Sequence, residues 1–88
     1  MVLLECVPNE VGEAAMRRLE VPVIGIGAGP DVDGQILVLY DILGITQGRT
    51  PRFVQNFQAG LDSPLAAIQA YVRAVKEREY PRPEHCFS

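Results

Sequence analysis

The chain has 88 residues, enough for one small domain, and a net charge of −3 that makes it mildly acidic. Its eight basic residues are scattered, with only Arg17 and Arg18 adjacent, so the sequence lacks the basic stripe of a nucleic-acid-binding face. No apolar run approaches the roughly 20 residues that span a bilayer, and Glu5 interrupts the first apolar stretch, so we expect neither a membrane span nor a signal peptide.

The first predicted elements form a strand–helix–strand unit. Residues 1–6 (MVLLEC) predict a buried strand, Pro8 ends it, and Asn9 is expected to cap a helix over residues 10–19. The apolar side chains on one face of this helix are Val11, Ala14, Ala15 and Leu19. Residues 21–26 predict a second strand that is apolar on both faces, which is typical of parallel sheets covered by helices.

The middle of the chain is less regular. Residues 35–39 (QILVL) have the length of a third strand, although residues 35–44 also fit a short helix. We expect the strand, followed by a helical turn over residues 40–43. Residues 44–51 predict a loop, and residues 51–57 (PRFVQNF) predict a short helix that begins at its proline.

The strongest helix signal comes near the end of the chain. Residues 62–64 (DSP) combine a cap residue with a following proline, and the predicted helix runs to about Glu79. Its expected buried face consists of Leu65, Ile68, Val72 and Val75, with Tyr71 beside them. Residues 80–88 are too rich in proline for a helix and form a C-terminal tail.

These elements amount to an α/β chain with three parallel strands. Three strands that are apolar on both faces leave two unpaired edges, which natural proteins normally cover. We therefore expect residues 1–88 to be a single fragment of a larger sheet.

The glycines of residues 25–29 (GIGAG) raise two possibilities, a nucleotide-binding fingerprint or the end of a barrel strand. A G-x-G-x-x-G motif that starts at Gly25 or Gly27 would need its third glycine at Pro30 or Val32, and no P-loop lysine follows. Glycines at alternate strand positions instead clear one face of the strand's carboxyl end for a ligand or a neighbouring backbone. In a (β/α)8 barrel that end binds substrate, although the glycines could merely relieve crowding.

Glu5 ends the first strand, at the same rim as Gly27 and Gly29 if the strands are parallel. A carboxylate at the end of an apolar strand loses solvation, which suits a general base. A rim glutamate that simply faces water is the alternative.

Five blocks along the chain carry a family resemblance: LLECVP (3–8), PVIGIGAG (22–29), DGQILVLYDILGI (33–45), PRFVQNF (51–57) and YPRPEHCF (80–87). Together they resemble ketopantoate hydroxymethyltransferase, a (β/α)8 barrel, and they match only its last third. Barrels of this kind have about 250 residues. The resemblance implies that this chain supplies about strands 6–8 with their helices.

The resemblance also implies a reaction. The family adds a hydroxymethyl group from 5,10-methylenetetrahydrofolate to 3-methyl-2-oxobutanoate, giving ketopantoate for pantothenate synthesis. A glutamate of its LECVP block removes the C3 proton, and that residue is Glu5 here. Magnesium stabilises the enolate, but the family's metal-binding aspartates lie upstream of this chain, so no metal ligand is assigned. Family members are homo-oligomers, and the implied partners are a small keto acid and folate.

The other residues of chemical interest are expected to have structural roles. Asp31, Asp33 and Asp41 should form turns, cap elements or face solvent. His85, the only histidine, should pack or cap the tail, and Cys6 should lie in the core.

The sequence departs from the family in two places, where Tyr40-Asp41 replaces a common His-Asp and Cys86 replaces a common serine. Neither departure affects the proposed base. The two cysteines are too few for a disulfide framework and lack C-x-x-C spacing, so we expect reduced thiols in the cytoplasm.

Three hypotheses follow. The chain is the C-terminal part of the enzyme, either cut from a longer protein or paired with a separate upstream chain. Alternatively, it is an inactive truncated remnant that associates with itself through its open edges. A small α/β binding module is the third hypothesis, and no motif supports it.

Overall fold

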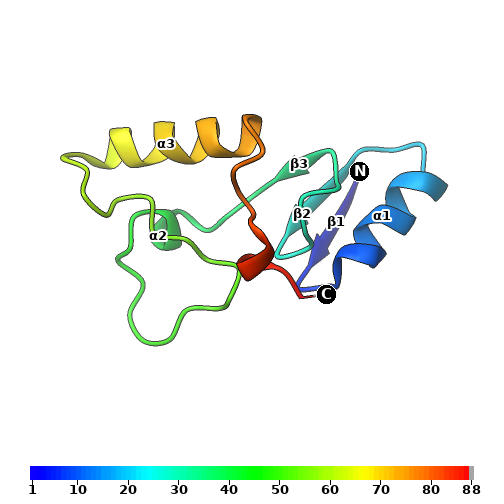
Figure 1. Ribbon diagram of the computed structural model, residues 1–88, viewed down its shortest axis with the longest axis horizontal. Coiled ribbons are helices and arrows are strands. Elements are labelled where there is room, and N and C mark those ends of the chain that lie inside the picture. The colour runs from blue at the N-terminus through cyan, green and yellow to red at the C-terminus, as the bar shows by residue number, and fades with distance from the viewer. Residues whose placement is uncertain (88) are drawn as a thin grey trace.

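The structure, a computed structural model, describes residues 1–87 and has two regions that lie end to end (Figure 1). The sheet region, residues 1–36, contains β1 (Val2–Glu5), α1 (Asn9–Arg18), β2 (Val23–Ile26) and β3 (Gly34–Gln35). The helical region, residues 37–87, contains α2 (Leu39–Ile42), α3 (Pro64–Lys76) and the 3₁₀ turn η1 (Pro83–His85). The molecule measures 42 × 24 × 20 Å, and its radius of gyration of 13.1 Å exceeds the about 12 Å typical of a compact chain of this length.

The sheet is parallel throughout, in the order β1-β2-β3, as the sequence predicts. Val2 pairs with Val23 and Glu5 pairs with Ile26, so the carboxyl ends of β1 and β2 lie level. The ladder continues past the strands, because the Cys6 amide donates to the Ile26 carbonyl at 2.9 Å. Within residues 1–87 no strand pairs with the outer edge of β1. The expectation of an open edge is therefore met in the described chain.

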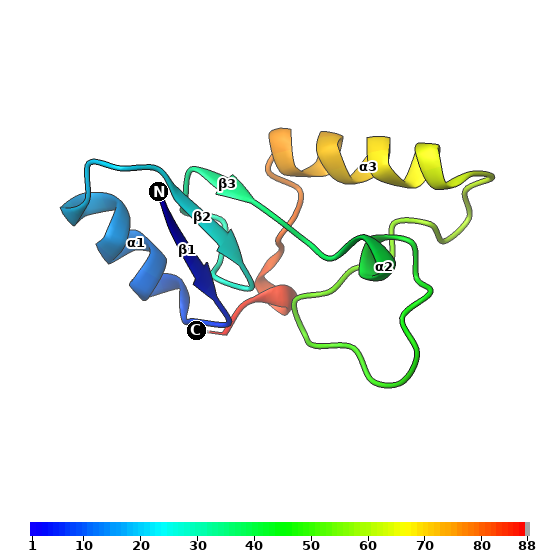
Figure 2. The same cartoon turned by 180° about the vertical axis from the view of Figure 1, so that it is seen from behind.

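Helix α1 packs on the sheet region through a glycine (Figure 2). Gly12 is its buried residue, and a Cβ at this position would lie 3.0 Å from the Ala28 carbonyl oxygen and 3.1 Å from a Val32 methyl group. This close approach leaves Val11 and Leu19 of the predicted apolar face exposed. The prediction that Asn9 caps the helix is wrong, since Pro8 occupies the cap position and Asn9 is the first helical residue.

The third strand is shorter than predicted. β3 ends at Gln35, and one further backbone bond joins the Ile36 amide to the Gly25 carbonyl at 2.9 Å. The expected strand over residues 35–39 fails because β2 ends at Ile26, which leaves residues 37–39 without a partner strand. The helical turn after it does form, as α2, one residue earlier than expected.

The predicted helix over residues 51–57 is absent, and this prediction is wrong. One turn forms there, with the Val54 amide donating to the Pro51 carbonyl at 3.1 Å. A helix would place Phe53 and Phe57 on one face. In the structure they serve different regions, because Phe53 packs on Gly27 of the sheet region while Phe57 enters the core of the helical region.

Helix α3 begins as predicted and packs by a different face. The Ala66 amide donates to the Ser63 hydroxyl at 3.1 Å, and Pro64 is the first helical residue. The helix ends at Lys76 rather than Glu79, because Arg78 adopts a left-handed backbone with a φ of 59°. The buried or core-facing side is Ala67, Ala70, Tyr71, Ala74 and Val75. The predicted face is therefore wrong at Leu65, Ile68 and Val72, which are 64%, 36% and 41% exposed.

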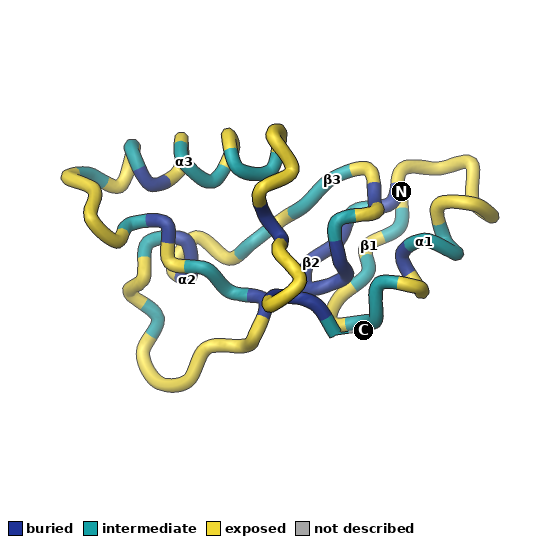
Figure 3. The backbone as a smooth tube through the Cα atoms, in the orientation of Figure 1, coloured by how far each residue is buried: buried dark blue, intermediate teal, exposed yellow. Residues whose placement is uncertain are grey.

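The helical region has an aromatic core. Ile42, Phe57, Ala67 and Tyr80 are buried together, and Tyr71 packs against them. The Phe57 ring lies edge-on to Tyr71 and Tyr80, with centroid distances of 5.4 and 5.5 Å. In the sheet region the buried backbone is concentrated in β2 and the turn that follows it (Figure 3).

Candidate functional site

Glu5 lies at the carboxyl end of β1, beside Ile26 at the carboxyl end of β2. Its side chain is exposed, so the expected loss of solvation is not seen in this chain. The next residue, Cys6, has a φ of 53°, a left-handed backbone that few residues other than glycine adopt. The chain therefore turns sharply just after Glu5, before α1 begins at Asn9. This geometry leaves the carboxylate free at the rim of the sheet.

The glycine stretch lies at the same rim but works differently from the prediction. Gly27 and Gly29 follow β2 in a turn with φ values of 67° and 83°, rather than occupying alternate strand positions. A Cβ on Gly27 would lie 2.6 Å from the Phe53 ring, and one on Gly29 would meet the Asn9 side chain. The space that the two glycines leave is thus filled by protein, which favours the alternative that they relieve crowding.

The three aspartates have mixed roles. Asp33 accepts a hydrogen bond from the Val23 amide at 2.8 Å and anchors the start of β2. Asp31 forms an exposed ion pair with Arg78 at 3.3 Å. Both agree with the predicted structural roles. Asp41 also has a hydrogen bond, from the Thr46 hydroxyl, but it is buried rather than exposed.

Asp41 lines a cavity of ≈ 360 Å³ between α2 and the following loop. Its lining residues are Asp41, Gly44, Thr46, Thr50, Val54 and Asn56. No sequence motif predicted this site. Its signal is the set of polar side chains in residues 44–56, a stretch that we interpreted only as a loop and a helix.

His85 packs and caps the C-terminal tail, as predicted. The buried imidazole accepts a hydrogen bond from the Arg82 amide through Nδ1 at 3.0 Å and lies 5.0 Å from the Tyr80 ring. Loss of solvation lowers the pKa of His85. The same loss of solvation has the opposite effect on an acid, and burial raises the pKa of the neighbouring Tyr80 phenol. His85 thus caps and packs the tail.

The cysteines are both free thiols. Cys86 is buried and its thiol donates to the Arg82 carbonyl at 3.2 Å, while the Arg52 guanidinium binds the Cys86 carbonyl at 3.4 Å. Cys6 is exposed, so the prediction that it lies in the core is wrong. Its left-handed backbone turns it out of the strand.

The described part of the chain does not fit a metal ion. Residues 1–87 bring no three histidine, cysteine, aspartate or glutamate side chains together as a metal site. We therefore derive no step through a metal from these residues. Among the same residues, none of the helices has the length and apolar character needed to cross a membrane.

Parallel strands in βαβ order, with an exposed carboxylate at their carboxyl rim, define an α/β unit consistent with part of a (β/α)8 barrel. The model of the ketopantoate hydroxymethyltransferase family matches residues 1–83, and the chain belongs to this family.

Known relatives agree with this assignment. The chain is 60% identical over 87 residues to 3-methyl-2-oxobutanoate hydroxymethyltransferase of Chromohalobacter salexigens, covering 99% of this chain and 33% of the relative. The enzymes of Alkalilimnicola ehrlichii and Aeromonas hydrophila are 59% and 51% identical, covering 99% and 100% of this chain and 31% and 33% of the relatives. The chain thus spans about a third of the length of these relatives and corresponds to their C-terminal region.

Proposed function

We propose that the chain contributes strands 6–8 of a ketopantoate hydroxymethyltransferase barrel and supplies its catalytic base. The reaction would add a hydroxymethyl group from 5,10-methylenetetrahydrofolate to 3-methyl-2-oxobutanoate. Family membership supports the activity. The observation that carries the role of the base is the exposed Glu5 carboxylate at the carboxyl rim of a parallel sheet, where barrel enzymes bind their substrates.

The chemistry assigned to Glu5 is removal of one proton. Its carboxylate takes the proton from C3 of the keto acid, and the C–H electron pair moves into the enolate. The enolate carbon then forms the new bond to the one-carbon unit. Magnesium would stabilise the enolate oxygen, and we propose that its ligands lie in the part of the relatives that precedes this chain.

The test follows the C3 proton of 3-methyl-2-oxobutanoate by NMR in D2O, with magnesium and the purified chain. Loss of exchange in Glu5→Gln, with exchange retained in the exposed helix variant Glu10→Gln, would support the base assignment. Equal exchange in Glu5→Gln and the wild type would refute it. No exchange from a chain shown to be folded would mean that it holds the base without a complete site.

The alternative proposal is an inactive, self-associating remnant. Two observations favour it. Leu3 and Val38 are both 54% exposed although their side chains are apolar, and the outer edge of β1 is unpaired in the described chain. Sedimentation velocity over a range of concentrations tests this proposal. Self-association that Leu3→Lys abolishes, in a chain without C3 exchange, would favour the remnant.

We further propose that the functional enzyme is a homo-oligomer in the cytoplasm, with the keto acid and folate as its small-molecule partners. The two free thiols support a reducing compartment. The exposed apolar side chains and the open β1 edge support association with further protein, either the remaining part of the barrel or other copies.

A further inference from the structure

The cavity beside α2 has a buried carboxylate with spare hydrogen-bonding capacity. Asp41 is 8% exposed, and it and His85 are the buried polar or charged residues of the described chain. Its Oδ1 accepts from the Thr46 hydroxyl, and no hydrogen bond within residues 1–87 reaches Oδ2. An ionised carboxylate oxygen without a protein partner can accept further hydrogen bonds, so this cavity is suited to a ligand that donates N–H groups.

The rest of the cavity offers complementary groups. The Asn56 carbonyl oxygen, Oδ1, accepts from the Gln58 amide at 2.9 Å, which leaves the NH2 group as the donating end of that side chain. Asn56 lies directly against Gly44, where a side chain would collide with it. Thr50 adds a hydroxyl group and Val54 an apolar wall. A flat ring with neighbouring N–H donors and a carbonyl acceptor matches this set of groups.

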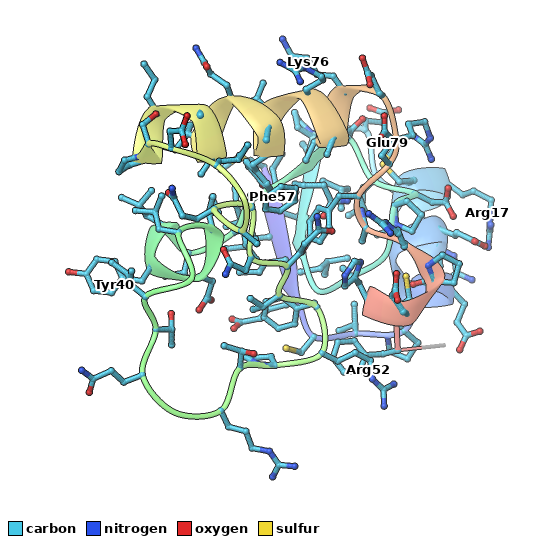
Figure 4. All side chains as sticks on the ribbon, turned by 60° about the vertical axis from the view of Figure 1, so that its left-hand side comes forward. Arg17, Tyr40, Arg52, Phe57, Lys76 and Glu79 are labelled. Atoms are coloured by element: carbon cyan, nitrogen blue, oxygen red, sulfur yellow. The ribbon has the colours of Figure 1, made fainter. Side chains whose placement is uncertain are left out.

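One contact connects the cavity loop to the rim that carries the proposed base. Val54, which lines it, follows Phe53, whose ring packs on Gly27. Gly27 in turn follows Ile26, the residue paired with Glu5. Figure 4 shows Tyr40, near one end of the cavity loop, directed away from the body of the protein. Arg52, near the other end, lies against the tail, where its guanidinium donates to the Cys86 carbonyl at 3.4 Å. Phe53 therefore connects the loop that lines the cavity to the turn that follows β2.

We propose that this cavity binds the pterin ring of a reduced folate, with Asp41 accepting from the ring's 2-amino and N3–H groups and Asn56 donating to its 4-oxo group. The volume of ≈ 360 Å³ falls within the about 300–1,000 Å³ of ligand pockets and suits a two-ring system rather than a whole folate. The inference rests on the proposed function, because the folate is the co-substrate of that reaction. It places the one-carbon carrier on the loop that contacts the rim of the sheet through Phe53, and Glu5 would form the enolate at that rim.

Calorimetric titration of the wild-type chain with 5-formyltetrahydrofolate, which is chemically stable, tests the proposal. Asp41→Asn keeps an oxygen for the Thr46 hydroxyl but removes the charge, and should weaken binding about 10- to 100-fold. Asp62→Asn removes an exposed carboxylate outside the cavity and should leave binding unchanged. No binding to the wild type, or equal binding to Asp41→Asn, would overturn the proposal.

Two further measurements show which part of folate is bound and whether a loss of binding comes from misfolding. Tetrahydropterin should compete with the folate, whereas p-aminobenzoylglutamate, the half of folate without the ring, should not. If Asp41→Asn does not fold, as judged by circular dichroism, Thr50→Val replaces it and should also weaken binding. If Asp41→Asn does not fold, an unchanged affinity in a folded Thr50→Val would overturn the proposal. Competition by p-aminobenzoylglutamate alone would also overturn it.

The outcomes distinguish this inference from the proposed function. Folate binding that depends on Asp41, together with C3 exchange that is insensitive to Glu5→Gln, would retain the pterin site and refute the base. Exchange that depends on Glu5, together with folate binding that is insensitive to Asp41→Asn, would retain the base and refute the pterin site.

Discussion

The sheet region and the helical region are stabilised in different ways. The sheet region depends on backbone hydrogen bonds among three short parallel strands, and its buried side chains are small, with Val23 and Ala28 the most completely enclosed. The helical region has the short helix α2, the longer helix α3 and the 3₁₀ turn η1. Its stability comes from aromatic rings that pack edge to face around Phe57 and Tyr80.

The two regions also differ in whether their elements are paired within the described residues. Parallel sheets are normally covered on both faces and paired at their edges, and here the outer edge of β1 stays open. The helical region encloses its own core. The two regions meet where Phe53 packs on Gly27 and where the Tyr71 hydroxyl donates to the Gln35 carbonyl at 3.1 Å. Substitutions can therefore break either region or the contact between them.

The largest effect is expected from Tyr80→Ala. Tyr80 is 3% exposed, packs against Phe57, Tyr71 and His85, and donates its hydroxyl to the Phe53 carbonyl. Removal of a buried aromatic side chain should lower the free energy of unfolding by about 3–5 kcal/mol. Urea unfolding followed by circular dichroism measures this loss, and hydrogen exchange should show it in residues 37–87 first.

Tyr80→Phe is the matched control, because it keeps the ring and removes only the hydroxyl group. It should cost about 1 kcal/mol. Equal losses for Tyr80→Phe and Tyr80→Ala would show that the Phe53 hydrogen bond, and not ring packing, stabilises the helical region.

The contact between the regions is tested by Gly27→Ala. Its left-handed φ of 67° and the Phe53 ring 2.6 Å from a Cβ should together cost about 2–4 kcal/mol. Gly48→Ala is the control, since Gly48 has a φ of 83° and open space around it, and should cost about 1–2 kcal/mol. Thermal unfolding of both variants measures the difference, and equal losses would argue against tight packing between Phe53 and Gly27.

The sequence predicted the features that depend on local signals. Apolar runs gave β1 and β2, the residues DSP gave the start of α3, and the end of an apolar strand placed Glu5 at the rim. The structural role of His85 was also predictable, because a single histidine in a proline-rich tail is more often a packing or capping group than a catalyst.

The predictions that failed concern features that depend on partners distant in the sequence. Residues 37–39 have strand composition, but β2 ends too early to pair with them. Residues 51–57 have a helix start, but Phe53 and Phe57 pack in different regions. The periodicity of α3 fits two faces, and packing selects the one with small residues such as Ala67. The Asp41 cavity was missed for the same reason, since a loop brings its polar groups together.

A smaller effect is expected at the start of α3, within the helical region. Ser63→Ala removes the side-chain acceptor for the Ala66 amide and should cost about 1 kcal/mol. Ser63→Asp should retain most of the stability, because aspartate also caps helices well. Chemical unfolding of the two variants checks the prediction, and a loss in Ser63→Asp equal to that in Ser63→Ala would count against the cap.

The smallest effect is a pH dependence in the tail of the helical region. Loss of solvation lowers the pKa of His85 below its ordinary value of 6.5, while Glu84 opposes this shift and Arg82 adds to it. The unfolded chain therefore binds the proton more tightly than the folded chain. The contribution of His85 to stability is complete above about pH 6.5 and is lost as the pH falls through the folded pKa.

Protonation at Nδ1 would also remove the acceptor for the Arg82 amide, so acidification should loosen the tail in particular. Melting temperatures between pH 5 and pH 8 (about 1.5 units on either side of the ordinary value) measure the effect for the wild type and His85→Asn. The asparagine can still accept from Arg82 but cannot titrate, so its melting temperature should depend less on pH over this range. An identical pH slope in the two proteins would assign the acid sensitivity to carboxylates elsewhere, and the difference between the two regions would then lie in packing alone.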